Sequence, residues 1–205
     1  MSSRSGSMPS ADSRNIAMAE RELQEQLAAR GLELLGSCDR LSQRPGLMEQ
    51  SALLRDFTPA EADLLGANMQ LVRARPGQLL IAEDEASDWM MLLLRGTVDV
   101  GKRRIAASDT DEASEVTRLA VLKEGATLGE MSMLDGEPRY ASCWALSEVE
   151  AAVLSRVAVG RLITSQPAVG AKLLVKITQL LAQRLRNTSS QLVKAIQKAA
   201  EPPPA

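Results

Sequence analysis

The chain has 205 residues, of which 45% are hydrophobic, 24% are charged and only 2% are aromatic, and its formal net charge is -2. This length suits one core domain with appended helices, and the core must consist of aliphatic side chains. The sequence contains no histidine, which excludes His-based acid–base catalysis and His-ligated metal sites. The near-neutral charge gives no reason to expect bulk attraction to nucleic acid or to anionic lipid.

The two cysteines, Cys38 and Cys143, are too few for a disulfide framework or a four-thiolate zinc site, which favours a reduced compartment. No apolar run reaches the roughly 18 residues of a membrane span. The polar start MSSRSGSMPSADSR lacks the apolar stretch of a signal peptide. We therefore expect a cytoplasmic protein without membrane contact. No nucleophile–base pair or metal cluster can be assembled, so we expect neither an enzyme nor a bound cofactor.

The N-terminal part is predicted to precede the core domain. Residues 1–13 are small and polar and are expected to be disordered. Residues 14–50 are predicted to form a helix, reaching about residue 35, and a linker. Its leucines fall near one helical stripe: Leu23, Leu27, Leu34 and Leu35. We interpret this helix as a packing brace for the core, although the pattern also allows it to dock a partner.

Residues 51–165 have the pattern of a β domain flanked by short helices. The sequence Thr58-Pro59-Ala60-Glu61 is a capping box that predicts a helix start. Short β-like runs separated by turn residues follow, and residues 107–115 form a polar acidic loop. These runs are QLVRA, QLLIA, WMMLLL, TVDV, RLAVL, SCWAL and VEAAVLS. Such regularly spaced strands predict an all-β barrel or sandwich.

Residues 166–200 are predicted to form one long helix, followed by a Pro-rich tail at 201–205. Its apolar residues recur every three or four positions and form a stripe: Leu174, Ile177, Leu181, Leu185, Leu192 and Ile196, with Thr188 on the same stripe. This spacing is typical of a helix that packs against another helix. We expect the helix to pair with its mate in a homodimer.

The stretch GEMSMLDGEPRYAS, residues 129–142, combines one carboxylate and one guanidinium within a compact turn. Gly129 permits a tight backbone turn, and residues 130–134 are predicted to form a helical turn whose free amides attract anions. Arg139 would meet two phosphate oxygens at once, and Glu130 would accept hydrogen bonds from sugar hydroxyls. The alternative is that Glu130 and Arg139 form a weak surface ion pair.

The same stretch resembles the phosphate-binding cassette of the cyclic-nucleotide-binding domain family. The matching residues are Gly129, Glu130, Leu134, Pro138, Arg139 and Ala141. The resemblance extends over residues 53–200 and implies an α+β fold. This fold is a β-roll, or jelly-roll-like barrel, flanked by short helices and followed by a long dimerisation helix. It further implies that Glu130 binds a ribose 2′-hydroxyl, that Arg139 binds a cyclic phosphate, and that the backbone N–H of Tyr140 contributes.

A second resemblance concerns AQRLRNTSSQLV, residues 182–193, which is similar to the dimer helix of catabolite-activator-type members of the family. That likeness implies that Thr188 and Ser189 contact the adenine base. The alternative is that both are weak helix formers on a solvated face. The predicted ligand-binding set is completed by two residues of the cassette turn, Met131 and Ser132, although Met131, like Met133, is also expected to face the core.

Two positions depart from the family pattern. Tyr140 follows Arg139 where the family usually has Ala, Ser or Thr, so its ring could stack on the ligand, cap the site or block it. Asp84 replaces a customary turn glycine, a mild change because Asp tolerates left-handed backbone. Trp89 and Trp144 are expected to pack in the core, and Cys143 is expected to be a small buried residue.

The leading hypothesis is a cyclic-nucleotide sensor with cyclic AMP as its regulatory ligand; cyclic GMP and cyclic di-GMP are alternatives, as is a ligand-free interaction scaffold with the same fold. A helix-turn-helix does not follow the long helix, so we expect no direct DNA binding and a signal passed to an unknown effector protein.

Overall fold

The computed structural model describes residues 11–103 and 116–200. Its helices are α1 (Ala11–Ala29), the 3₁₀ helix η1 (Leu41–Gln43), α2 (Leu47–Gln50), α3 (Pro59–Gly66), α4 (Glu130–Asp135), α5 (Arg156–Ser165) and α6 (Pro167–Ala200). Its strands are β1 (Glu33–Ser37), β2 (Gln70–Ala74), β3 (Leu79–Ile81), β4 (Trp89–Arg95), β5 (Val98–Arg103), β6 (Val116–Leu122), β7 (Thr127–Leu128), β8 (Ser142–Ala145) and β9 (Val149–Ser155).

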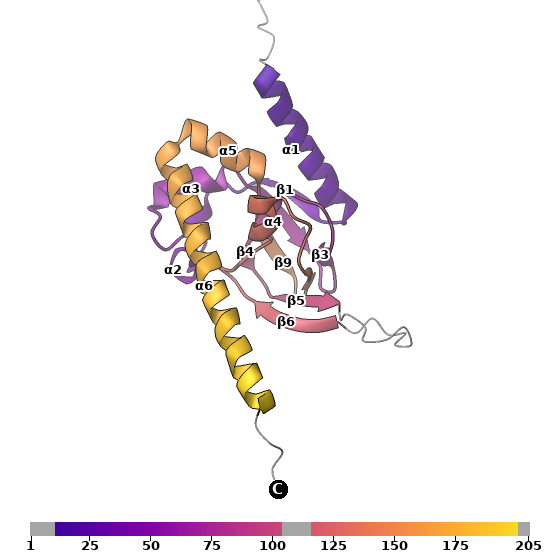
Figure 1. Ribbon diagram of the computed structural model, residues 1–205. Coiled ribbons are helices and arrows are strands. Elements are labelled where there is room, and N and C mark those ends of the chain that lie inside the picture. Colours follow the sequence, from indigo (N-terminus) through magenta and orange to yellow (C-terminus); the bar gives the residue numbers. More distant parts are fainter. Residues whose placement is uncertain (1–10, 104–115, 201–205) are drawn as a thin grey trace, which may run out of the picture.

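Two antiparallel sheets form the body of the protein (Figure 1). One has five strands in the order β1-β2-β9-β4-β7, and the other has four strands in the order β3-β8-β5-β6. Helix α5 lies above this body in the view of Figure 1, α6 runs down its left side and extends beyond it, and α1 lies at the upper right. The predicted β-roll with flanking helices and a long C-terminal helix is thus confirmed. None of the described helices is long and apolar enough to cross a membrane.

The sequence WMMLLL of β4 is apolar throughout because this strand is buried on both faces. Met90, Leu92 and Leu94 pack into a core shared with α3, α5 and α6. The alternate residues Trp89, Met91 and Leu93 pack into a second core between the two sheets. Alternation of side chains along a strand sends neighbours to opposite faces, so a strand between two cores needs apolar residues at every position.

The capping box predicted at Thr58 is present. The Thr58 hydroxyl accepts a hydrogen bond from the Glu61 N–H, and the Glu61 carboxylate accepts one from the Thr58 N–H. The Asp84 backbone is left-handed, with φ 66°, as expected for a residue that replaces a turn glycine. The acidic loop predicted at 107–115 and the tail at 201–205 lie outside the described residues.

The predicted N-terminal helix begins and ends earlier than expected. It starts at Ala11, so residues 11–13, which were expected to be disordered, are helical. It ends at Ala29, because Gly31 adopts a left-handed φ of 73° that ends the helix, and residues 33–37 form the edge strand β1. Two of the four predicted stripe leucines, Leu23 and Leu27, are buried. The other two, Leu34 and Leu35, lie on β1, where the period is two residues rather than 3.6. The segment predicted as a linker also contains the short helix α2. The division of the chain into domains stays a prediction.

Candidate functional site

The cassette predicted from residues 129–142 is a loop and a short helix between β7 and β8. Gly129 precedes α4 with a φ of 78°, and a Cβ added there would lie 2.5 Å from Nη1 of Arg139. Only glycine satisfies both the left-handed backbone and this close approach. Gly136 ends α4 with a φ of 80°. The predicted helical turn at 130–134 is confirmed as α4.

Arg139 is buried, with 2% of its surface exposed. Its Nε donates to the Ser87 hydroxyl at 2.6 Å, its Nη1 to the Gly129 carbonyl at 2.6 Å and its Nη2 to the Trp89 carbonyl at 2.5 Å. Since a guanidinium has five N–H donors, two remain without a partner among the described residues. These three bonds fix the plane of the guanidinium at the wall of a cavity.

The buried charge of Arg139 has no carboxylate ion pair within the described part of the chain. Its pKa is lowered to about 10, first by burial and then by the charge of Arg30. Glu85 and Asp88 raise the pKa only through longer-range attraction. A buried cation without a paired anion is unfavourable, and an anionic ligand would remove that cost.

Glu130 is even less exposed, at 1%. One of its carboxylate oxygens, Oε1, is ion-paired with Arg184 of α6. The other, Oε2, is buried and has no hydrogen-bond donor among the described residues. A buried carboxylate oxygen without a donor is costly, so this atom is prepared to accept a hydrogen bond from a ligand.

Arg139 and Glu130 open onto one cavity of about 140 Å³. Its floor and walls are mostly apolar side chains from both sheets: Ile81, Val100, Leu119, Leu122, Leu128 and Cys143. Burial raises the pKa of the Cys143 thiol to about 12, so this cysteine is a neutral, apolar wall, as expected from its sequence position. The cavity therefore combines one cation, one carboxylate oxygen and an apolar surface.

Seven of the nine predicted ligand-binding residues line this cavity: Gly129, Glu130, Met131, Ser132, Arg139, Tyr140 and Ala141. The core-facing prediction for Met131 is wrong, because 48% of this side chain is exposed, whereas Met133 is buried. One turn of α4 presents these two residues to opposite sides. Thr188 and Ser189 lie on the exposed stretch of α6 and are not among the cavity-lining residues.

Tyr140 lies at the rim of the cavity, with 60% of its surface exposed. The Lys102 ammonium sits 4.1 Å from the centre of its ring and donates to its carbonyl at 2.7 Å. A side chain that filled the cavity would be buried, so the ring does not block the site in this structure.

Sequence reasoning missed Arg184. It donates to the Thr127 carbonyl at 2.6 Å as well as pairing with Glu130, and so attaches α6 to the cassette. The sequence did contain an indication of this role. Arg184 lies four residues before Thr188, and this spacing places both side chains on one helix face. Trp89 is buried as expected, and its ring also lies 4.4 Å from the Arg139 guanidinium. No pattern in the sequence indicated that contact.

The geometry agrees with comparisons to known proteins. Residues 71–166 match the model of the family described as cyclic nucleotide-binding domain. A cyclic nucleotide-binding domain from Methylobacillus flagellatus KT is 32% identical, with a TM-score of 0.68, over 80% of this chain and 89% of that one. The chain belongs to the cyclic nucleotide-binding domain family.

Two curated relatives are named for different functions, one as a transcriptional regulator and the other as a kinase regulatory subunit. A CRP-like cAMP-activated global transcriptional regulator of Mycobacterium tuberculosis is 27% identical over 73% of this chain and 62% of its own length. A cAMP-dependent protein kinase regulatory subunit of Yarrowia lipolytica is 27% identical over 68% of this chain and 34% of its own length. The chain therefore spans less than two thirds of either relative.

Proposed function

We propose that this protein is a cyclic-nucleotide sensor that binds cyclic AMP through the cassette of residues 129–141. The observation that carries this proposal is the pair of unsatisfied buried groups in one cavity. Among the residues that the structure describes, Arg139 is a buried cation without a carboxylate partner, and Glu130 Oε2 is a buried acceptor without a donor. A ligand with one phosphate and one sugar hydroxyl meets both needs at once.

Cyclic AMP is the favoured nucleotide because both curated relatives carry it in their names. The phosphate would accept hydrogen bonds from the two remaining N–H groups of Arg139. The ribose hydroxyl would donate to Oε2 of Glu130, while Oε1 keeps its ion pair with Arg184. The ligand would then connect the cassette with α6 and shift a pre-existing equilibrium of that helix.

The exposed part of α6 is proposed to pair with a second copy. Leu185, Leu192 and Ile196 are each at least 59% exposed, and such a stripe favours a helix partner. In this arrangement Thr188 and Ser189, which follow Arg184 on the same helix, would contact the base. The sensor would act on an effector protein. A cytoplasmic location agrees with the two free, buried cysteines.

The test is titration calorimetry of the purified chain with cyclic AMP, cyclic GMP and cyclic di-GMP. Arg139→Lys keeps the charge but removes the two-pronged contact, and Arg139→Ala removes both. We expect cyclic AMP to bind the wild type and both variants to lose at least about 100-fold in affinity, about 2.7 kcal/mol. Arg118→Ala is the matched control, because Arg118 is an exposed arginine paired with Asp99.

The nucleotide that binds distinguishes the proposed function from its alternatives. Binding of cyclic di-GMP alone would replace the proposed ligand with a cyclic dinucleotide. Binding of none of the three nucleotides would favour an interaction scaffold with the same fold. Thermal unfolding of each variant separates a loss of affinity from a loss of folding.

A further inference from the structure

Helix α1 reaches the surroundings of Arg139 through the indole of Trp89. The Trp89 Nε1–H donates to Oε1 of Gln26 in α1 at 3.2 Å. The guanidinium of Arg30, just after α1, lies 5.5 Å from the centre of the indole, and that of Arg139 lies 4.4 Å from it. The Trp89 carbonyl also accepts the bond from Arg139 Nη2. Trp89 is fully buried, so the position of its ring depends on these neighbours.

The segment of residues 84–88 links the same helix to the backbone of Arg139. The Arg139 N–H donates to the Glu85 carbonyl at 2.9 Å, and its carbonyl accepts from the Asp84 N–H at 2.9 Å. The Ser87 hydroxyl accepts from the Arg139 side chain. The carboxylate of Glu85 is ion-paired with Arg30, whose side chain is only 11% exposed. One short segment thus holds both the backbone and the side chain of Arg139.

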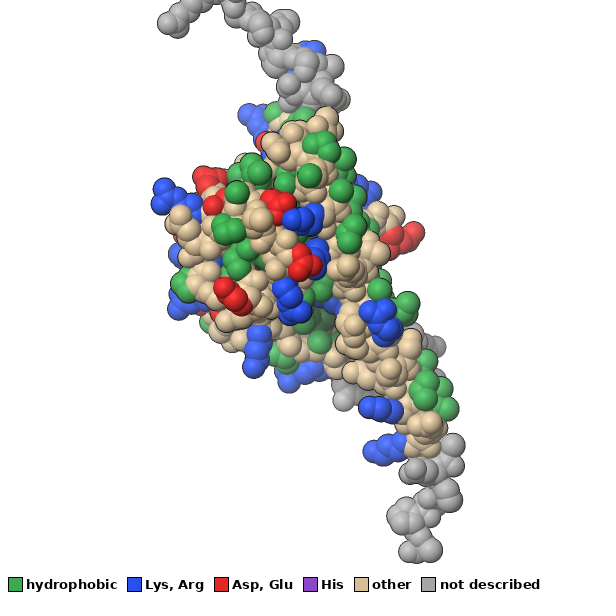
Figure 2. All heavy atoms as spheres, turned by 90° about the vertical axis from the view of Figure 1, so that its left-hand side faces the viewer, with side chains coloured by type: hydrophobic (Ala, Val, Ile, Leu, Met, Phe, Trp, Pro, Cys, Tyr) green, Lys and Arg blue, Asp and Glu red, His purple; other side chains and the backbone are tan. Residues whose placement is uncertain are grey.

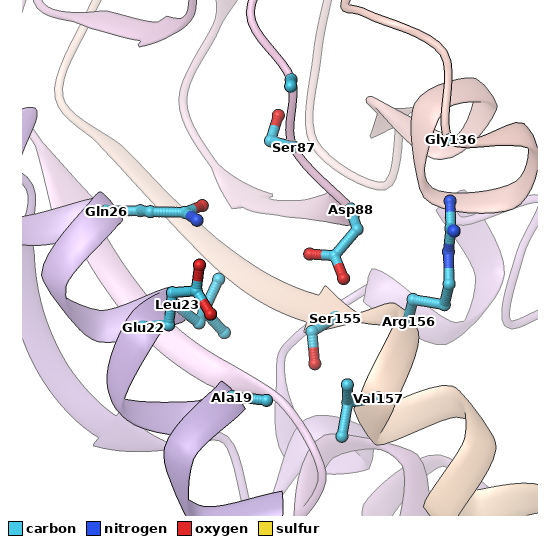
Figure 3. A pocket seen from close by; sticks show the side chains of 11 residues that line it. Ala19, Glu22, Leu23, Gln26, Ser87, Asp88, Gly136, Ser155, Arg156 and Val157 are labelled. Carbon is cyan, nitrogen blue, oxygen red and sulfur yellow. The ribbon is translucent and has the colours of Figure 1, made fainter. Parts of the chain in front are cut away.

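A cavity of about 260 Å³ lies between α1 and the rear of the cassette (Figure 3). Leu23 and Gln26 form its α1 side, and Gly136 and Arg156 lie on its cassette side. Because this space separates α1 from α4, the contacts that join α1 to Arg139 run through the buried Trp89 and through the segment of residues 84–88, whose Ser87 lines the cavity. A change in α1 is therefore expected to act on Arg139 rather than on α4 directly.

We propose that Gln26 and Arg30 are positioning residues of the ligand site, which makes α1 part of the binding machinery. This inference rests on the proposed function. Gln26 fixes the indole on which the Arg139 guanidinium lies, and Arg30 fixes Glu85 and adds positive potential beside Arg139. Helix α1 lies outside residues 71–166, which match the family model, so this contribution comes from a segment that the family match does not include.

Loss of either positioning residue should weaken ligand binding. In Gln26→Leu the buried indole N–H loses its acceptor, and the ring loses the hydrogen bond that holds it in this orientation. In Arg30→Gln the carboxylate of Glu85 loses its partner, and a positive charge beside the phosphate site disappears. Both changes reduce the attraction of Arg139 for a phosphate.

The experiment uses the full chain with Gln26→Leu, Arg30→Gln and Arg30→Lys. Gln24→Leu is the matched control, since Gln24 lies on α1 but bonds to Gln70. We expect Gln26→Leu and Arg30→Gln to weaken cyclic AMP binding at least about tenfold in calorimetry at a temperature where each variant is folded. Gln24→Leu should stay within about twofold, and Arg30→Lys should recover part of the loss because it restores the charge.

A second readout does not depend on nucleotide binding. The Arg139 Nε–H, which is buried and bonded to Ser87, should give a slowly exchanging NMR signal that Arg139→Lys removes. Gln26→Leu and Arg30→Gln should accelerate its exchange with solvent, and Gln24→Leu should not. Unchanged affinity together with unchanged exchange would overturn the inference and leave α1 as a packing brace. Absence of nucleotide binding in the wild type would overturn the proposed function, and the exchange measurement would still decide the positioning claim.

Discussion

Along the first half of α6, residues 167–181, one face packs against the body of the protein, and Val169, Leu173 and Ile177 on it are buried, whereas Val175 is 55% exposed. Along the second half, residues 182–199, side chains of the same kind are exposed: Leu185, Leu192, Val193 and Ile196. Figure 2 shows hydrophobic side chains on the stretch of α6 that extends beyond the body. The periodic pattern is shared by both halves. Identical periodicity therefore marks a buried interface in one half and an uncovered surface in the other.

The largest expected effect is a difference in the free energy of unfolding between substitutions in the first and the second half of α6. Leu173→Ala removes a fully buried side chain from the core and should lower the free energy of unfolding by about 2–5 kcal/mol. Leu192→Ala, at a residue that is 60% exposed, should change it by less than about 0.5 kcal/mol in the monomer. Urea unfolding at several protein concentrations measures both. Equal losses in the two variants at low concentration would contradict the comparison.

Arg184 lies at the boundary between the halves and attaches α6 to Glu130. Arg184→Gln leaves the Glu130 carboxylate buried without its ion pair and should cost about 1–3 kcal/mol. The loss is expected to be below that for a fully buried pair because 43% of the Arg184 side chain is exposed. Glu130→Gln in the same chain should recover part of the loss, as measured by chemical unfolding. If the Arg184→Gln/Glu130→Gln variant is less stable than Arg184→Gln alone, the ion pair is not what stabilises the contact between α6 and Glu130.

The proposed homodimer gives a third prediction, confined to the second half of α6. Leu192→Glu places a charge on the exposed stripe and should weaken self-association at least about tenfold, or 1.4 kcal/mol. Analytical ultracentrifugation of the wild type and the variant measures this change. Leu64→Glu, on the exposed surface of α3, serves as a control for adding the same charge to the same residue type. A wild type that stays monomeric at all concentrations would refute the pairing.

The smallest effect concerns two ion pairs of the first half. Asp56 is paired with Lys176, and Glu61 with Lys172. Hydrogen bonds from these lysines are the main cause that lowers the pKa values of both carboxyls below their ordinary values of 3.8 and 4.5. The pairs therefore stabilise the fold above those values, and their contribution disappears as the pH falls through the lowered pKa values.

Thermal unfolding between pH 7 and pH 3 tests this sign. The melting temperature of an Asp56→Asn/Glu61→Gln variant should lie below that of the wild type at pH 7, and the difference should shrink at low pH. A difference that stays constant with pH would show that the substitutions act through packing rather than through charge.

The sequence by itself determined most of the strands and the cassette. Local rules decide these features: the capping box at Thr58, the alternation of strand residues and the left-handed turn at Asp84 each depend on near neighbours. The sequence did not predict the strands β1 and β7. The first carries the helix-like spacing of Leu34 and Leu35, and the second has only two residues. Their pairing partners lie far away in the sequence.

Only the tertiary structure decided the surroundings of the two charged residues of the site. The sequence predicted Glu130 and Arg139, but not that Arg184 would pair with one and Trp89 would lie beneath the other. These contacts join residues about 50 positions apart, as the hydrogen bonds from Arg184 and Arg139 show. A charge is visible in a sequence, but its burial and its partner depend on the packing of distant segments. For the same reason the periodic stripe of α6 specified a helix without specifying what covers it.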